Sequence, residues 1–231
     1  ALTPVEGAIH RGRDPGGLRI GGRNGEVRVV KAVLTDTQSS LRVPIAELGI
    51  RGLHNVANAC AAALAARLLG VRESDIASVL REFKGLAHRM QYVSSVEGVE
   101  YIDDSKATNV GAAVASIDGL AGGNGKIVLI AGGVDKGGSY EPLRQRMMER
   151  GRALVVLGEA APLLERAFAD SSLELRHAQS MAEAVDSASA VAVSGDIVLL
   201  APACSSFDMF RSYAERGDQF QSAVHSLGGH V

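Results

Sequence analysis

The chain has 231 residues, of which 46% are hydrophobic and 22% are charged, close to the average for globular proteins. This length suffices for one or two domains with buried cores and excludes a small protein held together by disulfides. The chain has 24 lysines and arginines against 26 aspartates and glutamates. A formal net charge of −2 gives no general electrostatic basis for binding nucleic acid or an anionic membrane. We therefore predict a folded protein that recognises its partners through local sites.

Cysteine and histidine usage gives no sign of a disulfide framework or a metal site. Cys60 and Cys204 lack the spacing of disulfide or zinc motifs, and the six histidines show no metal-ligand spacing. Apolar runs such as residues 127–131 and 197–201 are far shorter than the ~20 residues that a membrane span needs. The N-terminus also lacks the apolar segment of a signal peptide. These features predict a protein of the reducing cytoplasm.

The first 85 residues read as a small antiparallel sheet followed by two helices. Residues 18–36 contain two alternating β-branched runs joined by Asn24-Gly25, a strong hairpin signal. Residues 55–69 are rich in alanine and leucine at helical spacing and end at Gly70, a typical residue after a helix C-terminus. Residues 75–83 predict a second helix, with Ser74 as its N-cap. We place a domain boundary after Gly85, which divides the chain into residues 1–85 and 86–231.

Beyond this boundary, short apolar strands alternate with amphipathic helices. This alternation predicts a doubly wound, Rossmann-like α/β domain whose parallel sheet is covered by helices on both faces. The expected strands are residues 99–102, 126–131, 154–157, 174–177 and 196–201. The expected helices are residues 110–120, 140–150, 161–169, 181–193 and a long final helix within 207–227.

Three of the five strands are followed by polar segments, and these predict the binding site. Ligands of such sheets bind beyond the carboxyl ends of the strands. The segments are residues 103–109 (DDSKATN), 132–138 (GGVDKGG) and 202–208 (PACSSFD). Together they predict a cleft that binds an anionic ligand, with glycines that allow close backbone approach.

Each segment also has a simpler interpretation. Ser105 or Thr108 could cap the following helix, the glycines could form a plain turn, and Ser205 and Ser206 could cap a helix that begins after the strand. The sequence contains neither a G-x-x-x-x-G-K-[ST] phosphate loop nor a G-x-G-x-x-G dinucleotide motif. A nicotinamide-dependent dehydrogenase is therefore not supported.

Six motifs, read in order, resemble the second half of a Mur ligase. The resemblance runs from about residue 40 to the C-terminus, and the DSKATN and PACSSFD pair is typical of the members that add glutamate. The motifs are HNVANA (54–59), GLAHRM (85–90), DDSKATN (103–109), GGVDKG (132–137), APACSSFDMF (201–210) and ERGDQF (215–220). Residues 1–85 then correspond to the hairpin and helical tail of the central ATPase-type domain, and residues 86–231 to the glutamate-binding domain.

The resemblance implies an ATP-dependent ligase of peptidoglycan precursor synthesis, which joins D-glutamate to UDP-N-acetylmuramoyl-L-alanine through an acyl phosphate. It implies that Asn58, Arg89 and Asp104 contact the nucleotide. Lys106 has a catalytic role in this interpretation and also receives glutamate, because an ammonium at a helix N-terminus can stabilise developing negative charge. The other residues implied to bind glutamate are Thr108, Lys136, Ser206, Phe207 and Tyr213. Further candidates for the site are His88, at a hinge between domains, Ser105 and Asp135.

The family's uridine-diphosphate-binding domain, its phosphate loop and its magnesium ligands do not occur in this chain. ATP and Mg²⁺ are the implied cofactors, and we expect no metal ligands here. We expect a monomer whose partners are small molecules. We expect catalysis only within the full-length enzyme, and weak binding of glutamate or ADP by the isolated chain. The alternatives are a stand-alone binding or regulatory module without catalysis, and an unrelated nucleotide-binding α/β domain.

Overall fold

The computed structural model describes residues 19–22, 25–30, 33–36, 40–50, 53–120 and 125–228. It divides into two compact units, the first ending at Gly85 and the second beginning at Leu86. None of the helices in these described ranges combines the length and the hydrophobicity that a membrane crossing requires.

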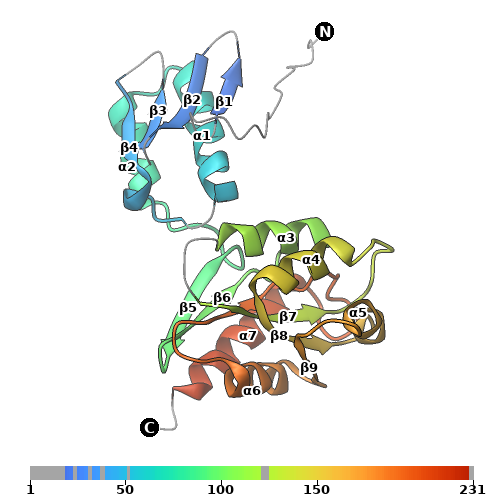
Figure 1. The fold of residues 1–231 in the computed structure, drawn as a ribbon. Helices are drawn as coiled ribbons and strands as arrows, with labels where there is room; N and C mark the ends of the chain where they lie inside the picture. The colour runs from blue at the N-terminus through green and yellow to red at the C-terminus, as the bar shows by residue number, and fades with distance from the viewer. Residues whose placement is uncertain are drawn as a thin grey trace. The chain divides into compact units, whose positions relative to one another are not determined.

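The first unit contains a four-stranded antiparallel sheet in the order β1-β2-β3-β4 and two helices (Figure 1). The predicted hairpin is confirmed by the pairing of Gly22 with Gly25, while Asn24 of its turn lies outside the described residues. The elements are β1 (Arg19–Gly22), β2 (Gly25–Val30), β3 (Val33–Asp36), β4 (Arg42–Pro44), the short 3-10 helix η1 (Ile45–Glu47), α1 (Leu53–Leu68) and α2 (Glu73–Glu82).

The two helices of this unit begin and end close to the predicted positions. Gly70 has a φ of +83°, and its N–H donates to the carbonyl of Arg67 at 2.9 Å, as expected after a helix C-terminus. The prediction that Ser74 caps α2 is wrong. The helix begins two residues earlier than predicted, at Glu73, and the residue before it, Arg72, makes no capping hydrogen bond through its side chain. The carboxylates of Glu73 and Asp75 in the first turn still interact favourably with the positive end of the helix dipole.

The second unit is built on a six-stranded sheet in the order β5-β6-β10-β7-β8-β9 (Figure 1). All neighbouring strands are parallel except β5, which pairs antiparallel with β6. The strands are β5 (Gln91–Val96), β6 (Val99–Asp103), β7 (Ile127–Gly132), β8 (Gly151–Leu157), β9 (Glu174–His177) and β10 (Ile197–Leu200). The helices are α3 (Val110–Gly119), α4 (Glu141–Arg150), α5 (Ala161–Phe168), α6 (Met181–Val191) and α7 (Tyr213–Leu227). The predicted α/β fold with a doubly wound sheet is therefore confirmed.

Two separate cores lie on the two faces of this sheet. Along β7, Ile127 and Leu129 belong to the core that contains α3, α4 and α5, whereas Val128 and Ile130 belong to the core that contains α6 and α7. This alternation follows from the period of two in a strand, and it explains why the strand reads as one continuous apolar run. The helices cover both faces of the sheet (Figure 1).

The chain reverses its direction across the sheet at β10. The strands β7, β8 and β9 run outward in sequence order, and β10 then returns to lie between β6 and β7. A crevice for ligands is expected at such a reversal, beyond the carboxyl ends of the strands. One further difference from the prediction concerns this unit: the edge strand β5 was not predicted. The final helix begins at Tyr213 and lies within the predicted range of residues 207–227.

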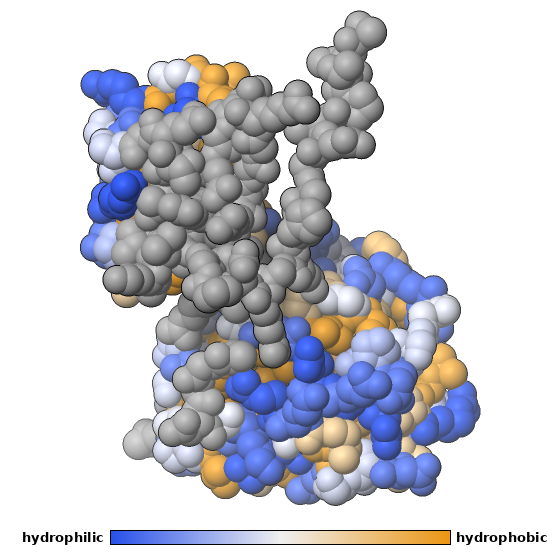
Figure 2. All heavy atoms as spheres, turned by 45° about the horizontal axis from the view of Figure 1, so that its top comes forward, coloured by the Kyte–Doolittle hydropathy of each residue, from blue (hydrophilic) through white to orange (hydrophobic). Residues whose placement is uncertain are grey.

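The exposed large hydrophobic side chains of the second unit are distributed over several elements. On the side visible in Figure 2, hydrophilic residues lie among the hydrophobic ones across this unit. The exposed hydrophobic residues of the unit are Leu86, Tyr92, Met148, Leu163, Val193 and Phe207. Isolated exposed residues of this kind are normal for a protein surface.

A buried carboxylate joins the opposite, amino-terminal ends of the strands. Asp196 is 2% exposed, and its oxygens accept hydrogen bonds from the backbone N–H groups of Lys126 (2.9 Å) and Val193 (3.0 Å) and from the guanidinium of Arg152. Burial by itself raises the pKa of Asp196, but the hydrogen bonds from Arg152 and the two N–H groups outweigh it, so the pKa lies below its ordinary value.

We expect Asp196→Asn to lower the free energy of unfolding of the second unit by about 1–3 kcal/mol at pH 7, because a buried charged acceptor loses part of its interactions. Because the pKa of Asp196 is lower in the folded state than its ordinary value of 3.8, the ionised carboxylate stabilises the fold at pH values above 3.8. This stabilisation is lost as the pH falls below 3.8 and the carboxylate becomes protonated. The variant should therefore lose less stability than the wild type between pH 5 and pH 3. Urea denaturation can follow tyrosine fluorescence, because all four tyrosines lie in the second unit. Equal pH dependence of the two proteins would contradict this role.

Candidate functional site

The three polar segments predicted to form a site lie side by side at the carboxyl ends of β6, β10 and β7. Backbone hydrogen bonds join them in pairs. The N–H of Ala203, after β10, donates to the carbonyl of Ala107, after β6, at 2.9 Å. Val134, after β7, and Ser205 exchange two hydrogen bonds of 2.9 and 3.0 Å. The segments therefore form one continuous surface around the inserted strand β10.

The glycines after β7 serve this contact between segments. Gly133 has a φ of +125°, and a Cβ built on it would lie 2.0 Å from the carbonyl oxygen of Ser205. The close backbone approach for which the glycine run was predicted is thus made here to the neighbouring loop. The interpretation as a plain turn is incomplete, because the turn also pairs with the segment after β10.

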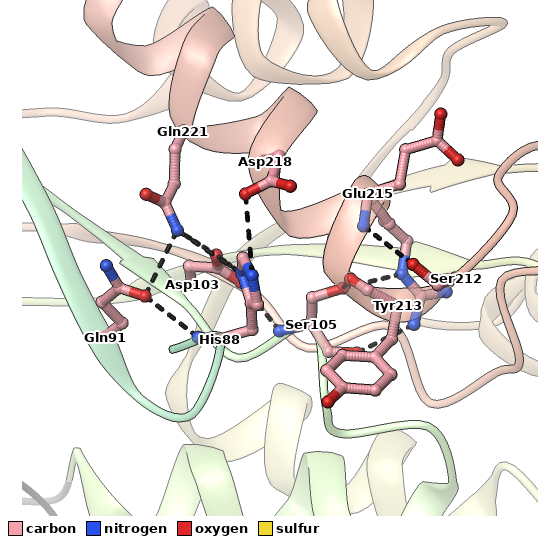
Figure 3. A network of polar contacts seen from close by, with 10 residues as sticks. His88, Gln91, Asp103, Ser105, Ser212, Tyr213, Glu215, Asp218 and Gln221 are labelled. Atoms are coloured by element: carbon pink, nitrogen blue, oxygen red, sulfur yellow. Dashed lines mark hydrogen bonds and ion pairs between the residues drawn. The ribbon is translucent and has the colours of Figure 1, made fainter. Parts of the chain in front are cut away.

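Lys106 lies over the ring of Tyr213, the first residue of α7. Its Nζ is 3.9 Å from the ring centroid, a distance typical of a cation–π contact. The adjacent Ser105 is fully buried, and its hydroxyl donates to the backbone carbonyl of Tyr213 at 2.7 Å (Figure 3). The segment after β6 and the start of α7 are thus joined by both a charged and a neutral contact. Because Ser105 has no exposed surface, its hydroxyl forms hydrogen bonds with other groups of the protein and is not accessible to a ligand in this structure.

Lys136 and Thr108 come together beside a cavity. The ammonium of Lys136 donates to the hydroxyl of Thr108 at 3.3 Å. The adjacent cavity has a volume of about 260 Å³. It is lined by Asn109, Val110, Gly111, Asp135, Lys136, Gly138 and Ala203. The N–H groups at the start of α3 and the Lys136 ammonium give one end of this cavity a positive character.

The turn that carries Lys136 is held by Asp135 and Tyr140. One oxygen of Asp135 accepts from the phenol of Tyr140 at 2.7 Å, and the other accepts from the N–H of Gly137 at 2.9 Å. These two hydrogen bonds lower the pKa of Asp135, so the carboxylate form is favoured. Burial, then the contacts with Cys204 and Asp135, raise the pKa of Tyr140 well above its ordinary value, which keeps the phenol protonated as a donor.

His88 belongs to a buried polar network at the start of the second unit (Figure 3). Its Nδ1 lies 2.8 Å from a carboxylate oxygen of Asp103, which is fully buried, and the same oxygen accepts from the amide of Gln221 at 2.7 Å. A carboxylate only accepts, so Nδ1 carries the proton in this arrangement. The backbone carbonyl of His88 in turn accepts from the N–H of Lys106 at 3.1 Å. His88 therefore supports the segment that carries Lys106.

The cap of α3 corrects one of the simpler interpretations of this region. The cap is Asn109, whose side chain accepts from the N–H of Ala112 at 2.9 Å, and neither Ser105 nor Thr108 has this role. Asp104, which was predicted to contact the nucleotide, is 7% exposed, and its carboxylate accepts a hydrogen bond from Ser116 of α3. Asp104 thus also anchors α3 to the end of β6.

The interpretation of Ser205 and Ser206 as helix caps is wrong. The helix starts only after Ser212, whose side chain accepts from the N–H of Glu215 at 3.1 Å (Figure 3). Ser206 is 2% exposed in the loop between β10 and α7, and its backbone carbonyl accepts from the N–H of Phe210 at 2.9 Å. Phe207, in contrast, is 73% exposed.

Two predicted nucleotide-binding residues lie outside this cluster of contacts. Asn58 is exposed on α1 of the first unit. Arg89 is exposed in the turn that follows His88 in the second unit, and its N–H donates to the carbonyl of Leu86 at 3.3 Å. Their roles remain predictions from the resemblance.

Arg216 of α7 was missed by the sequence reasoning. It is 1% exposed, and its guanidinium reaches the ends of β6, β7 and β10 at once. The sequence does contain a signal for it. Arg216, Phe220 and Val224 are spaced by four residues, so the arginine continues the apolar stripe of the helix. A charged residue in such a stripe indicates a buried polar partner.

The cysteines and acidic residues do not form a metal site in the described ranges. Cys60 and Cys204 are free and buried, and burial raises the pKa of Cys60 to about 11. The described residues contain no group of three or more histidine, cysteine, aspartate or glutamate side chains that could hold a metal ion. They therefore do not fit the magnesium that the resemblance implies, and no ligand for it is assigned.

Comparison with known proteins gives the same family as the motifs. Residues 88–204 match the family model described as Mur ligase, glutamate ligase domain. UDP-N-acetylmuramoylalanine–D-glutamate ligases of Burkholderia mallei and Burkholderia pseudomallei are 48% identical over 185 residues, which is 80% of this chain and 36% of their own length. The chain thus spans about a third of the length of these curated relatives.

Solved structures of low sequence identity share the fold. UDP-N-acetylmuramate-alanine ligase from Thermotoga maritima matches with a TM-score of 0.62 at 16% identity, over 90% of this chain and 45% of that one. The MurF ligase of Thermotoga maritima in complex with ADP matches with a TM-score of 0.58 at 18% identity, over 91% and 46% of the two chains. The family model covers half of the sequence, and its match begins at His88 and includes the segments after β6 and β7 and the first residues of the segment after β10, up to Cys204. The motifs, the fold and these matches together show that the chain belongs to the Mur ligase family.

Proposed function

We propose that this chain forms the C-terminal part of an ATP-dependent ligase that adds D-glutamate to UDP-N-acetylmuramoyl-L-alanine in peptidoglycan precursor synthesis. The carrying observation is the cluster at the ends of β6, β10 and β7, where Lys106, Thr108, Lys136 and Tyr213 lie around one surface with a cavity beside it. The 48% identity to ligases with this name supports the choice of substrate. A reaction that consumes ATP supports the cytoplasmic location.

The cavity suits a small dicarboxylic amino acid. Its volume of about 260 Å³ lies below the roughly 300–1,000 Å³ of sites for drug-sized ligands. In this proposal, the Lys136 ammonium, the Thr108 hydroxyl and the N–H groups of Val110 and Gly111 bind one carboxylate of glutamate. A carboxylate bound at a helix N-terminus by charged and neutral donors is a favourable arrangement.

The proposed reaction has two steps. A carboxylate oxygen of the alanyl group attacks the γ-phosphorus of ATP, and ADP leaves, which forms an acyl phosphate. The amine of glutamate then attacks the acyl carbon, phosphate leaves, and an amide is formed with loss of the amine proton. Negative charge develops on the phosphoryl oxygens and on the oxygen of the tetrahedral intermediate. Lys106 supplies a fixed positive charge for it, held by the Tyr213 ring and by the backbone of His88.

The remaining predicted roles belong to the same proposal. Arg89, Asp104 and Asn58 contact the nucleotide, and Ser206 and Phe207 complete the glutamate site from the loop after β10. The first unit is the tail of the central ATPase-type domain. It exposes large hydrophobic side chains on and after its helices, which supports packing against a further part of that domain. They are Leu68, Leu69, Val71, Val79 and Phe83.

An assay of the full-length protein tests the proposal directly. The protein is incubated with ATP, UDP-N-acetylmuramoyl-L-alanine and either D- or L-glutamate, and the amide product is measured by mass spectrometry together with phosphate release. We expect one phosphate per amide with D-glutamate and no amide with L-glutamate. Binding of glutamate without any amide formation would instead favour a binding module without catalysis.

Within this assay, we expect Lys136→Ala to raise the KM for glutamate by about tenfold to a hundredfold, because a charged hydrogen bond to the substrate carboxylate is lost. The KM for ATP should change by less than about threefold, since Lys136 contacts Thr108 at the glutamate cavity. Arg176→Ala is a matched control, because Arg176 is a half-buried cation on β9 that pairs with Glu174. An unchanged KM for glutamate in Lys136→Ala would remove Lys136 from the site.

A further inference from the structure

Arg216 is a buried cation whose hydrogen-bond acceptors are all neutral oxygens. Its Nε donates to the hydroxyl of Ser105 at 3.0 Å, and its Nη2 donates to the carbonyl of the same residue at 2.9 Å. Its Nη1 lies 3.2, 3.3 and 3.5 Å from the carbonyls of Cys204, Ser205 and Gly132. Burial lowers the pKa of Arg216 to about 10, so it remains charged at neutral pH. A single guanidinium thus joins the ends of β6, β10 and β7.

Such an arrangement adds little to the stability of the fold, but it fixes the positions of the groups that the guanidinium contacts. Removing a guanidinium from water costs free energy that hydrogen bonds to carbonyl groups offset only in part. The planar fork with five N–H donors, however, fixes several acceptors at set distances and angles. A lysine ammonium at the end of a flexible chain cannot span the same acceptors.

One of the residues held in this way, Ser105, adjoins the contact between Lys106 and Tyr213. The Ser105 hydroxyl accepts from Arg216 and donates to the carbonyl of Tyr213, and Ser105 directly precedes Lys106. Arg216 itself lies one helical turn after Tyr213. The guanidinium therefore links the segment that carries Lys106 to the helix that begins at Tyr213, over whose ring the Lys106 ammonium lies at 3.9 Å.

We propose that Arg216 is a positioning residue that sets the place of the Lys106 ammonium over the Tyr213 ring by joining the three strand-end segments through its guanidinium. Its effect on catalysis rests on the proposed function, whereas its effect on the position of Lys106 does not. The motif ERGDQF is then explained by the need for an arginine whose fork faces the strand ends from α7.

The position of Lys106 can be measured by NMR on the 231-residue chain. Protons above an aromatic ring resonate upfield of their usual shift, so the ε-methylene protons of Lys106 should be displaced upfield, and Lys106→Ala identifies their signal. In Arg216→Lys, we expect this signal to move most of the way back to the shift of an exposed lysine. The methyl signals of Leu129 and Leu154 in the core should stay in place. Arg211→Lys is the matched control, because Arg211 is 90% exposed and precedes the same helix.

Steady-state kinetics of the full-length ligase give a second readout. Arg216→Lys should raise the KM for glutamate and lower kcat, each by about tenfold or more, because small displacements of substrate-binding groups are costly, with less than about a threefold change in the KM for ATP. If this variant does not fold, Ser105→Ala is tested instead. It keeps the guanidinium but removes the hydroxyl that joins Arg216 to the Tyr213 carbonyl, and a smaller shift of the same Lys106 signal is expected. An unmoved Lys106 signal in the folded variant would overturn the proposal. If the wild-type protein shows no ligase activity, the proposed function fails, but the NMR result still decides whether Arg216 positions Lys106.

Discussion

Lys106→Ala is expected to lower the turnover of the full-length ligase by about 10²–10³-fold, which is typical for removing one group that stabilises developing negative charge. The ammonium lies over the ring of Tyr213, and the Lys106 backbone N–H is bonded to His88, so its charge is held in place. The loss should therefore appear mainly in kcat. It is measured as the rate of amide formation at saturating ATP and glutamate.

The fold should tolerate the same substitution. A partly exposed cation over an aromatic ring contributes roughly 0.5–1 kcal/mol, so the free energy of unfolding should change by no more than this. Lys126→Ala is the matched control, because Lys126 is exposed just before β7, at the opposite end of the sheet, and its loss should leave turnover unchanged. Normal amide formation by the Lys106→Ala enzyme would show that this ammonium has no part in the reaction.

Gly217→Ala should give the largest loss of stability, about 2–4 kcal/mol, because it forces a methyl group into a closed polar network. A Cβ built on Gly217 would lie 2.1 Å from the ring Nδ1 of His88 and 2.8 Å from a carboxylate oxygen of Asp103. Both side chains are buried and hydrogen-bonded to each other, so neither can move without losing its partner. Urea denaturation followed by tyrosine fluorescence measures this change in the second unit.

A second glycine provides the control for backbone effects. Gly111 also lies within a helix, α3, and a Cβ there would meet only the side chain of Asn109, at an ordinary distance of 3.5 Å. Gly111→Ala should therefore stabilise by about 0.5–1 kcal/mol, since alanine favours a helix over glycine by this amount. Equal effects of the two substitutions would mean that the His88 network does not require the glycine.

The elements whose signals are local could be predicted from the sequence. The hairpin around Gly25, the end of α1 at Gly70 and the alternation of strands and helices after Gly85 all depend on neighbouring residues. The edge strand β5 was missed because its sequence QYVSSV has two adjacent serines and no clear alternation. Its partner β6 provides the pairing that the strand's own residues do not specify.

Prediction was weaker where long-range contacts decide the outcome. One interpretation had Ser205 and Ser206 capping a helix directly after β10, but Ser205 pairs with Val134 instead. A turn follows at residues 207–209, and the helix starts only after Ser212. Arg216 was missed because a charged residue in a helix is normally assigned to the exposed face. Only the three strand ends around it provide the acceptors that allow its burial.

The chemistry of the site is thus contained in the sequence: lysines, hydroxyl groups and glycines follow three apolar strands, and their types and order identify the family. The sequence also predicted that these segments share one cleft, but only the tertiary structure decided how they meet, because β10 returns to lie between β6 and β7, which precede it by many residues in the chain. Local periodicity specifies which residues form a strand and which face they present. The order of strands in the sheet depends on how the helices pack on its two faces, and no local pattern encodes it.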